Sequence, residues 1–132
     1  MTAPLRYGLP TILAAVLAAC APAVDTATLS PVTYPPRPAD FRIRMYSTQR
    51  PRCPFEELAT VRSRKPNFFV SMEDVAESIR QVAREMGGDA VIAVTTGGEL
   101  RGGTVVGGNV SMDTDPVLNG TIVRFKEDDC RE

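Results

Sequence analysis

One stretch of the chain, residues 71–86, constrains the fold more than any other. Its apolar residues recur at spacings of three and four, which makes one continuous stripe along a helix: Met72, Val75, Ala76, Ile79, Val82, Ala83 and Met86. Ser71 is a good N-cap, with Asp74 three residues later in a capping-box-like arrangement. Gly87 and Gly88 then provide a left-handed ending. The pattern predicts an amphipathic helix whose stripe must be covered by a sheet.

Runs with strand character lie on both sides of this helix. Residues 41–46 alternate between apolar and polar side chains, the period of a half-buried strand. The other predicted strands are 57–63, 90–95 and 121–125, with a strand or loose hairpin over 97–108 and a loop over 113–119. We therefore predict an α+β domain with one helix on a sheet of about four to five strands. The expected order is strand–strand–helix–strand–(strand)–strand.

The first twenty residues have the pattern of an export signal. Arg6 is their only charged residue, residues 8–16 are almost entirely apolar, and residues 17–20 (Leu-Ala-Ala-Cys) match the lipobox. The apolar run is too short for a membrane span, which needs about 20 residues. We predict a lipoprotein signal peptide over 1–19 and acylation of Cys20 by fatty acids such as palmitate, which anchors the chain to a membrane. A chance cysteine after an ordinary secretory signal is the alternative.

The residues that follow Cys20 bear on location and reach. Ala21, rather than Asp, favours the outer membrane over retention in the inner membrane, with the domain facing the periplasm. Residues 21–39 hold five prolines and no periodic apolar face, which predicts a spacer that reaches roughly 60 Å when extended. The expected organisation is therefore the signal peptide over 1–19, the lipidated cysteine and tether over 20–39, and the folded domain over 40–132.

Two cysteines remain besides Cys20. Cys53 precedes the predicted strand 57–63, and Cys130 follows the last predicted strand. In an oxidising periplasm an even pair predicts a disulfide. A redox-active pair and a thiolate metal site are the alternatives, although neither cysteine has the Cys-x-x-Cys context that is typical of redox sites.

The composition argues against catalysis. The chain contains no histidine, the commonest general base and metal ligand. The sequence also lacks the Gly-x-Ser-x-Gly and Walker A motifs. We expect no enzymatic activity, no cofactor and no metal site. The net charge of −1 gives no reason to expect general nucleic-acid binding.

Most basic residues are arginines, and they concentrate in residues 37–65. Alternation places Arg42 and Arg44 on one face of a strand, and it places Arg62 and Arg64 on one face of another. If those strands pair, a guanidinium-rich patch results, suited to carboxylates or phosphates. Lipid head groups, lipopolysaccharide or an acidic protein face are the candidate partners, and a merely solvated sheet face is the alternative.

Three segments carry a family resemblance. They are 53–61 (Cys-Pro-Phe-Glu-Glu-Leu-Ala-Thr-Val), 86–94 (Met-Gly-Gly-Asp-Ala-Val-Ile-Ala-Val) and 120–125 (Gly-Thr-Ile-Val-Arg-Phe). With the lipobox, they make the chain resemble RcsF-type envelope lipoproteins and the related YbjQ-like small domains over about residues 40–130. The chain has two cysteines available where RcsF uses four, and Ala59 where the family commonly has Gly. The resemblance implies an outer-membrane stress sensor that contacts envelope proteins and is stabilised by disulfides.

Together these patterns predict a non-enzymatic outer-membrane lipoprotein that presents an α+β domain to an envelope protein. The alternative is a small-ligand or metal-binding module of the YbjQ-like kind.

Overall fold

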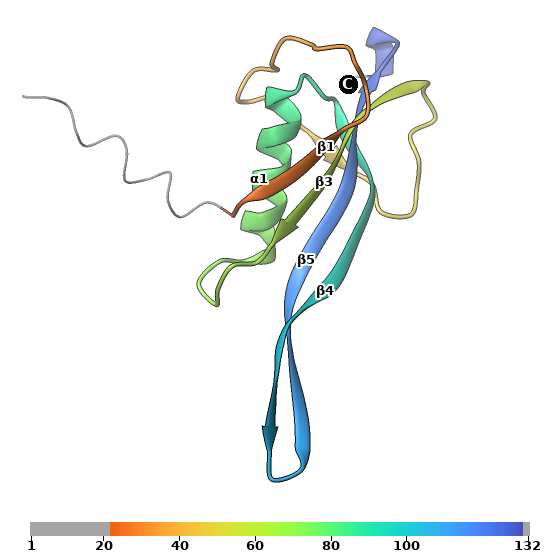
Figure 1. The fold of residues 1–132 in the computed structure, drawn as a ribbon. Coiled ribbons are helices and arrows are strands. Elements are labelled where there is room, and N and C mark those ends of the chain that lie inside the picture. The colour runs from red at the N-terminus through yellow and green to blue at the C-terminus, as the bar shows by residue number, and fades with distance from the viewer. Residues whose placement is uncertain (1–21, 131–132) are drawn as a thin grey trace, which may run out of the picture.

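The computed structural model describes residues 22–130, where one helix packs on one face of a five-stranded mixed sheet (Figure 1). This confirms the predicted α+β class. The strands are β1 (Val24–Thr28), β2 (Arg44–Met45), β3 (Phe55–Arg64), β4 (Ala90–Val106) and β5 (Asn109–Phe125). The helix is α1 (Met72–Glu85), and a short 3-10 helix, η2, covers Asp128–Cys130.

The strands lie in the order β1-β3-β5-β4-β2, with β2 parallel to β4 and the other neighbours antiparallel. At one end of the sheet Val24 pairs with Ser63, and Arg64 pairs with Val117. At the other end Phe55 pairs with Phe125. We call the first the ribbon end, because β4 and β5 continue beyond it, and the second the disulfide end.

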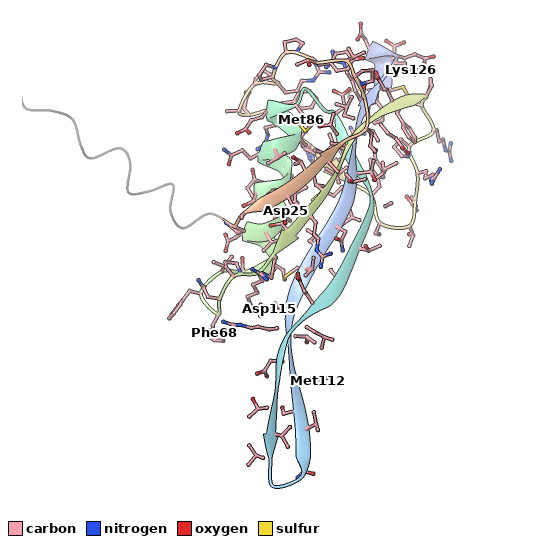
Figure 2. The ribbon with its side chains drawn as sticks, in the orientation of Figure 1. Asp25, Phe68, Met86, Met112, Asp115 and Lys126 are labelled. Atoms are coloured by element: carbon pink, nitrogen blue, oxygen red, sulfur yellow. A yellow bond between two sulfur atoms is a disulfide. The ribbon has the colours of Figure 1, made fainter. Side chains whose placement is uncertain are left out.

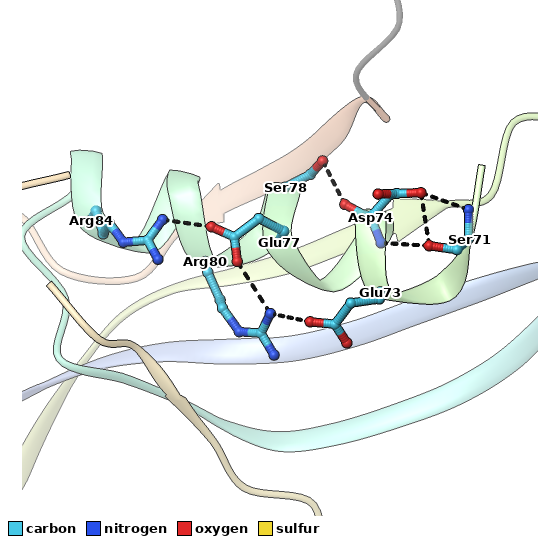
Figure 3. A network of polar contacts seen from close by, with 7 residues as sticks. All are labelled: Ser71, Glu73, Asp74, Glu77, Ser78, Arg80 and Arg84. Atoms are coloured by element: carbon cyan, nitrogen blue, oxygen red, sulfur yellow. Dashed lines mark hydrogen bonds and ion pairs between the residues drawn. The ribbon is translucent and has the colours of Figure 1, made fainter. Parts of the chain in front are cut away.

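Helix α1 begins and ends as its sequence predicts. The Ser71 hydroxyl accepts from the Asp74 N–H, and the Asp74 carboxylate accepts from the Ser71 N–H, which completes the capping box (Figure 3). Gly87 ends the helix with φ +75°. A methyl group at Gly87 would lie 2.7 Å from the carbonyl oxygen of Pro35, so glycine also lets residues 34–35 approach closely.

The core has two parts, one on each face of the sheet. Between α1 and the sheet lie Val75, Ile79, Ala83, Val61, Val91 and Ile122. On the opposite face, at the disulfide end, Ile92, Val123 and Phe125 pack with Ala90 under Tyr46, Phe55 and the two cysteines. The sheet is therefore covered on both faces at the disulfide end.

The predicted tether over 20–39 is wrong within the described residues. Residues 24–28 form β1, which pairs with β3 along its open edge. The five prolines misled the composition argument, because all of them lie outside the strand. Val24, Thr26 and Thr28, which are β-branched and alternate, were the local strand signal. The domain therefore begins before β1 and not near Asp40.

The predicted loop over 113–119 is also wrong, because these residues belong to β5. Strands β4 and β5 form one long hairpin that turns at Gly107 and Gly108. These glycines have φ values of +58° and +85°, as a two-residue type I′ turn requires. Conversely, the strand predicted over 41–46 shrinks to β2, since only Arg44 and Met45 pair with β4.

Candidate functional site

The four arginines predicted as one patch do not come together. Arg44 lies in β2 and Arg42 lies two residues before it, whereas Arg62 and Arg64 lie on β3. Strands β5 and β4 separate these two strands, so the pairing that the patch required does not form. Arg62 instead donates to Glu99 on β4, with an Nη2–Oε2 distance of 3.0 Å.

Arg42 and Arg44 instead lie at the β2 edge of the sheet, next to the helix. With Tyr46 they line a polar groove of about 560 Å³ against α1, which contributes Glu77, Arg80 and Arg84. We call this the arginine groove. The two helical arginines were not predicted as site residues, because they lie outside the apolar stripe of the helix and outside the basic stretch 37–65. Nothing in the local sequence predicts that residues 42–46 lie opposite them.

Ion pairs already neutralise the helical side of this groove. Arg80 contacts Glu73 at 2.6 Å and Glu77 at 3.2 Å, and Arg84 contacts Glu77 at 2.8 Å (Figure 3). The hydrogen bond from Arg84 lowers the pKa of Glu77. Arg42 and Arg44 make no ion pair within residues 22–130, so they supply the positive charge available to an anion.

Residues 29–41 are bound to the disulfide end of the domain, and we call them the docked segment. The hydroxyls of Ser30 and Tyr34 both donate to the Glu56 carboxylate on β3, the first over 2.5 Å. These bonds, that of Ser30 first, lower the pKa of Glu56. The bond to Glu56 correspondingly raises the pKa of Tyr34. Arg124 stacks over the Tyr34 ring, 4.3 Å from its centroid.

A buried ion pair fixes the same segment further along. Arg37 Nη2 lies 2.7 Å from Asp89 Oδ1, and the Asp89 side chain is completely buried. The other Asp89 oxygen accepts from the Phe125 N–H at 2.8 Å. The Arg37 N–H also donates to the Arg84 carbonyl at the end of α1. The docked segment is therefore part of the folded domain and is not a free contact surface.

The most exposed apolar element is the outer part of the β4–β5 hairpin, residues 98–116, which we call the ribbon. It continues past the body of the sheet. Its base contacts the β3–α1 loop, where the Lys65 N–H donates to the Pro116 carbonyl at 2.9 Å, and Figure 1 shows no other described segment beside its tip. Its large apolar side chains are 63–70 % exposed: Leu100, Val105, Val106, Val110 and Met112. The ribbon has no core of its own.

Strand register places most of these side chains on one face. Val105 lies opposite Val110, and Met112 follows two residues later on the same face. Leu100 lies opposite Thr114, which continues that face past Met112. The other face carries Thr104, Ser111 and Asp113, with Val106 near the turn. The ribbon is therefore amphipathic, with an apolar face formed by Leu100, Val105, Val110 and Met112.

Sequence reasoning predicted a strand or loose hairpin over 97–108, but it missed that the return strand runs from Asn109 into the body of β5. Gly107 and Gly108 lie between two β-branched runs, a hairpin signature. The other glycines of residues 97–103 hid that signature, because they suggested turns throughout. Pro116 and the polar run before it then suggested a loop.

Cys53 and Cys130 form a disulfide, with their Cα atoms 6.2 Å apart. The predicted pairing is therefore confirmed. It joins η2 to the loop before β3 and covers the second core cluster. Cys20, the predicted lipidation site, lies outside the described residues.

Two further features, a metal-binding cluster and a membrane-spanning helix, are absent from residues 22–130. No group of three or more carboxylate or cysteine side chains there is arranged to hold a metal ion. None of the helices in that range is long and apolar enough to cross a membrane.

Comparison with known proteins gives no further assignment. No protein-family model, curated protein or solved structure matches the chain.

Proposed function

We propose that the chain is a non-enzymatic bacterial lipoprotein, anchored to the outer membrane through Cys20, whose domain binds an envelope protein through the ribbon. The lipobox at residues 17–20 supports the anchor. The Cys53–Cys130 disulfide agrees with an oxidising compartment such as the periplasm. The resemblance to RcsF-type lipoproteins adds envelope-stress sensing to this proposal.

The amphipathic ribbon is the observation that carries the proposal of a protein partner. An isolated two-stranded hairpin is at best marginally stable in water, and this one keeps four large apolar side chains on one solvent-facing surface. Exposed apolar patches of this kind mark interaction sites. Full burial of each side chain contributes about 1.5–3 kcal/mol before the cost of association.

The ribbon also offers hydrogen bonds to a partner. Beyond Val117 the outer edge of β5 no longer pairs with β3, and β2 pairs with β4 only at Ala90 and Val91. Apart from the Pro116 carbonyl, which accepts from the Lys65 N–H, both edges of the ribbon therefore present backbone N–H and C=O groups. A partner strand can add to either edge while its side chains cover the apolar face.

Photocrosslinking in the living bacterium tests this assignment. A photoreactive amino acid at Val110 or Met112 should capture one protein adduct of constant mass. The same amino acid at Ser111 or Asp113, on the same strand but the polar face, should capture much less of it. All four positions are exposed, so the replacements preserve folding. Equal capture from both faces, or none from either, would contradict the proposal.

A further inference from the structure

Two phenylalanines protrude from the loop between β3 and α1. Phe68 is 90 % exposed and Phe69 is 93 % exposed. The Asn67 side-chain oxygen accepts from the N–H groups of Phe69 and Val70, at 3.0 and 3.2 Å. The loop therefore has a defined turn that holds both rings in solvent. Full exposure of two adjacent phenylalanines forgoes a large hydrophobic contribution.

This loop lies at the ribbon end, beside the point where the described chain begins. Val24 pairs with Ser63, and the Ser63 hydroxyl donates to the Ala23 carbonyl at 2.9 Å. Ala23 and Pro66 line one surface hollow together. Phe68 and Asp115 line a second surface hollow. Figure 2 shows Phe68 and Asp115 at the same end of the molecule.

Chain geometry limits how far this end lies from Cys20. Three residues separate Cys20 from Val24, so their Cα atoms are four steps and at most about 14 Å apart, even in a fully extended chain. Val24 itself is fixed in the sheet by its pairing with Ser63. A bilayer that holds the acyl chains of Cys20 therefore lies next to the ribbon end and not roughly 60 Å away.

We propose that Phe68 and Phe69 insert into the interfacial layer of the phospholipid bilayer that anchors Cys20. The inference rests on the proposed lipid anchor. Aromatic rings favour the head-group level of a membrane, where an apolar ring is buried beside polar groups. Arg64 and Lys65 immediately precede the loop and make no ion pair with any described residue, so they are available to lipid phosphates.

The position of the loop next to the proposed anchor favours a bilayer over a protein as the surface that Phe68 and Phe69 contact. The anchor holds the loop within a short distance of lipid at all times, which gives a high effective concentration of membrane. A second contact then fixes the orientation of a domain that an acyl chain alone would leave free to rotate. The β3–α1 loop then faces the membrane.

Tryptophan fluorescence tests the insertion, because the chain contains no tryptophan. The Phe68→Trp variant therefore contains one tryptophan as its fluorescence reporter. The protein used begins at Cys20 and includes every described residue. With Cys53 and Cys130 oxidised, Cys20 is the one thiol. It is coupled to a maleimide lipid in phosphatidylethanolamine–phosphatidylglycerol vesicles with brominated acyl chains. Lys126→Trp, an exposed position at the disulfide end, is the matched control.

The Phe68→Trp emission should shift to the blue and be quenched by the brominated chains, while the Lys126→Trp emission should do neither. Absence of quenching at Phe68→Trp in protein that floats with the vesicles would overturn the inference. Equal quenching of both reporters would overturn it as well. Since coupling replaces cellular acylation, a failure of the cell to acylate Cys20 counts against the proposed lipoprotein and is distinguished from a failure of the loop to insert.

Discussion

Two carboxylates, Asp89 and Glu56, hold the docked segment to the domain, and they do so in different environments. Asp89 is completely buried and forms its ion pair with Arg37, whose side chain is 17 % exposed. Glu56 is half-buried and accepts from two hydroxyls of the docked segment. The first contact should therefore govern stability, and the second should make docking sensitive to acid.

Arg37→Ala should lower the free energy of unfolding by about 3 kcal/mol, because it leaves the Asp89 carboxylate buried without its ion-pair partner. Urea denaturation measures the change. Arg42→Ala removes an exposed arginine a few residues away and should change stability by less than about 0.5 kcal/mol. A similar small effect of Arg37→Ala would mean that the ion pair does not hold the segment.

Acid should weaken the docked segment through Glu56. Hydrogen bonds from Ser30 and Tyr34 lower the pKa of Glu56 below its usual value of 4.5. A carboxyl group with a lowered folded-state pKa stabilises the fold above the unfolded-state pKa, and that stability is lost as pH falls through the folded value. The contribution of Glu56 should therefore be complete above about pH 5 and decline below 4.5.

Comparison with Glu56→Gln isolates this group from Asp74 and Glu77, whose pKa values are also lowered. The difference in thermal midpoint between the two proteins should be constant at neutral pH and shrink between about pH 5 and pH 3. A difference that stays constant throughout this range would show that the Glu56 pKa is not perturbed by folding.

At the scale of elements, the sequence predicted those whose signals are local. Helix α1 was predictable because its stripe, its capping box and Gly87 all lie within one stretch. Strand β3 was predictable from residues 57–63 and proved three residues longer. The Cys53–Cys130 disulfide followed from counting cysteines in a chain predicted to be exported.

Elements that depend on a distant partner were not predictable in this way. Strand β1 forms because it pairs with the open edge of β3. Its sequence pattern is weak, and the prolines around it predicted a spacer instead. Arg42 and Arg44 lie next to α1 because β2 pairs with β4, and no local sequence pattern predicts that β4 is the strand beside β2. The return strand of the ribbon was missed because exposed strands lack the buried face that periodicity arguments detect.

At the scale of the whole molecule, β1 begins at the end of the sheet from which the ribbon extends. The ribbon extends about 27 Å beyond the sheet, given eight steps of strand from Gly98 to Val106. Its unpaired edges exclude it from the hydrocarbon layer, where each free backbone group costs several kcal/mol. We infer that the ribbon lies along the membrane surface and reaches a partner that is itself at the membrane.

This arrangement changes the role expected for residues 21–39. A long spacer would let the domain search the periplasm far from the bilayer. The pairing of β1 with β3 leaves only three residues between Cys20 and Val24. The proposed anchor would therefore keep the domain close to the bilayer.

The proposed membrane anchor depends on acylation of Cys20. The intact mass of the protein, extracted from membranes of the bacterium, measures this acylation. We predict a chain that begins at Cys20 and carries the added mass of a diacylglyceryl group with a further acyl chain. Cys20→Ser should abolish that species and release the protein from the membrane fraction. A wild-type chain that retains residues 1–19, or that begins at another residue without lipid, would contradict the account.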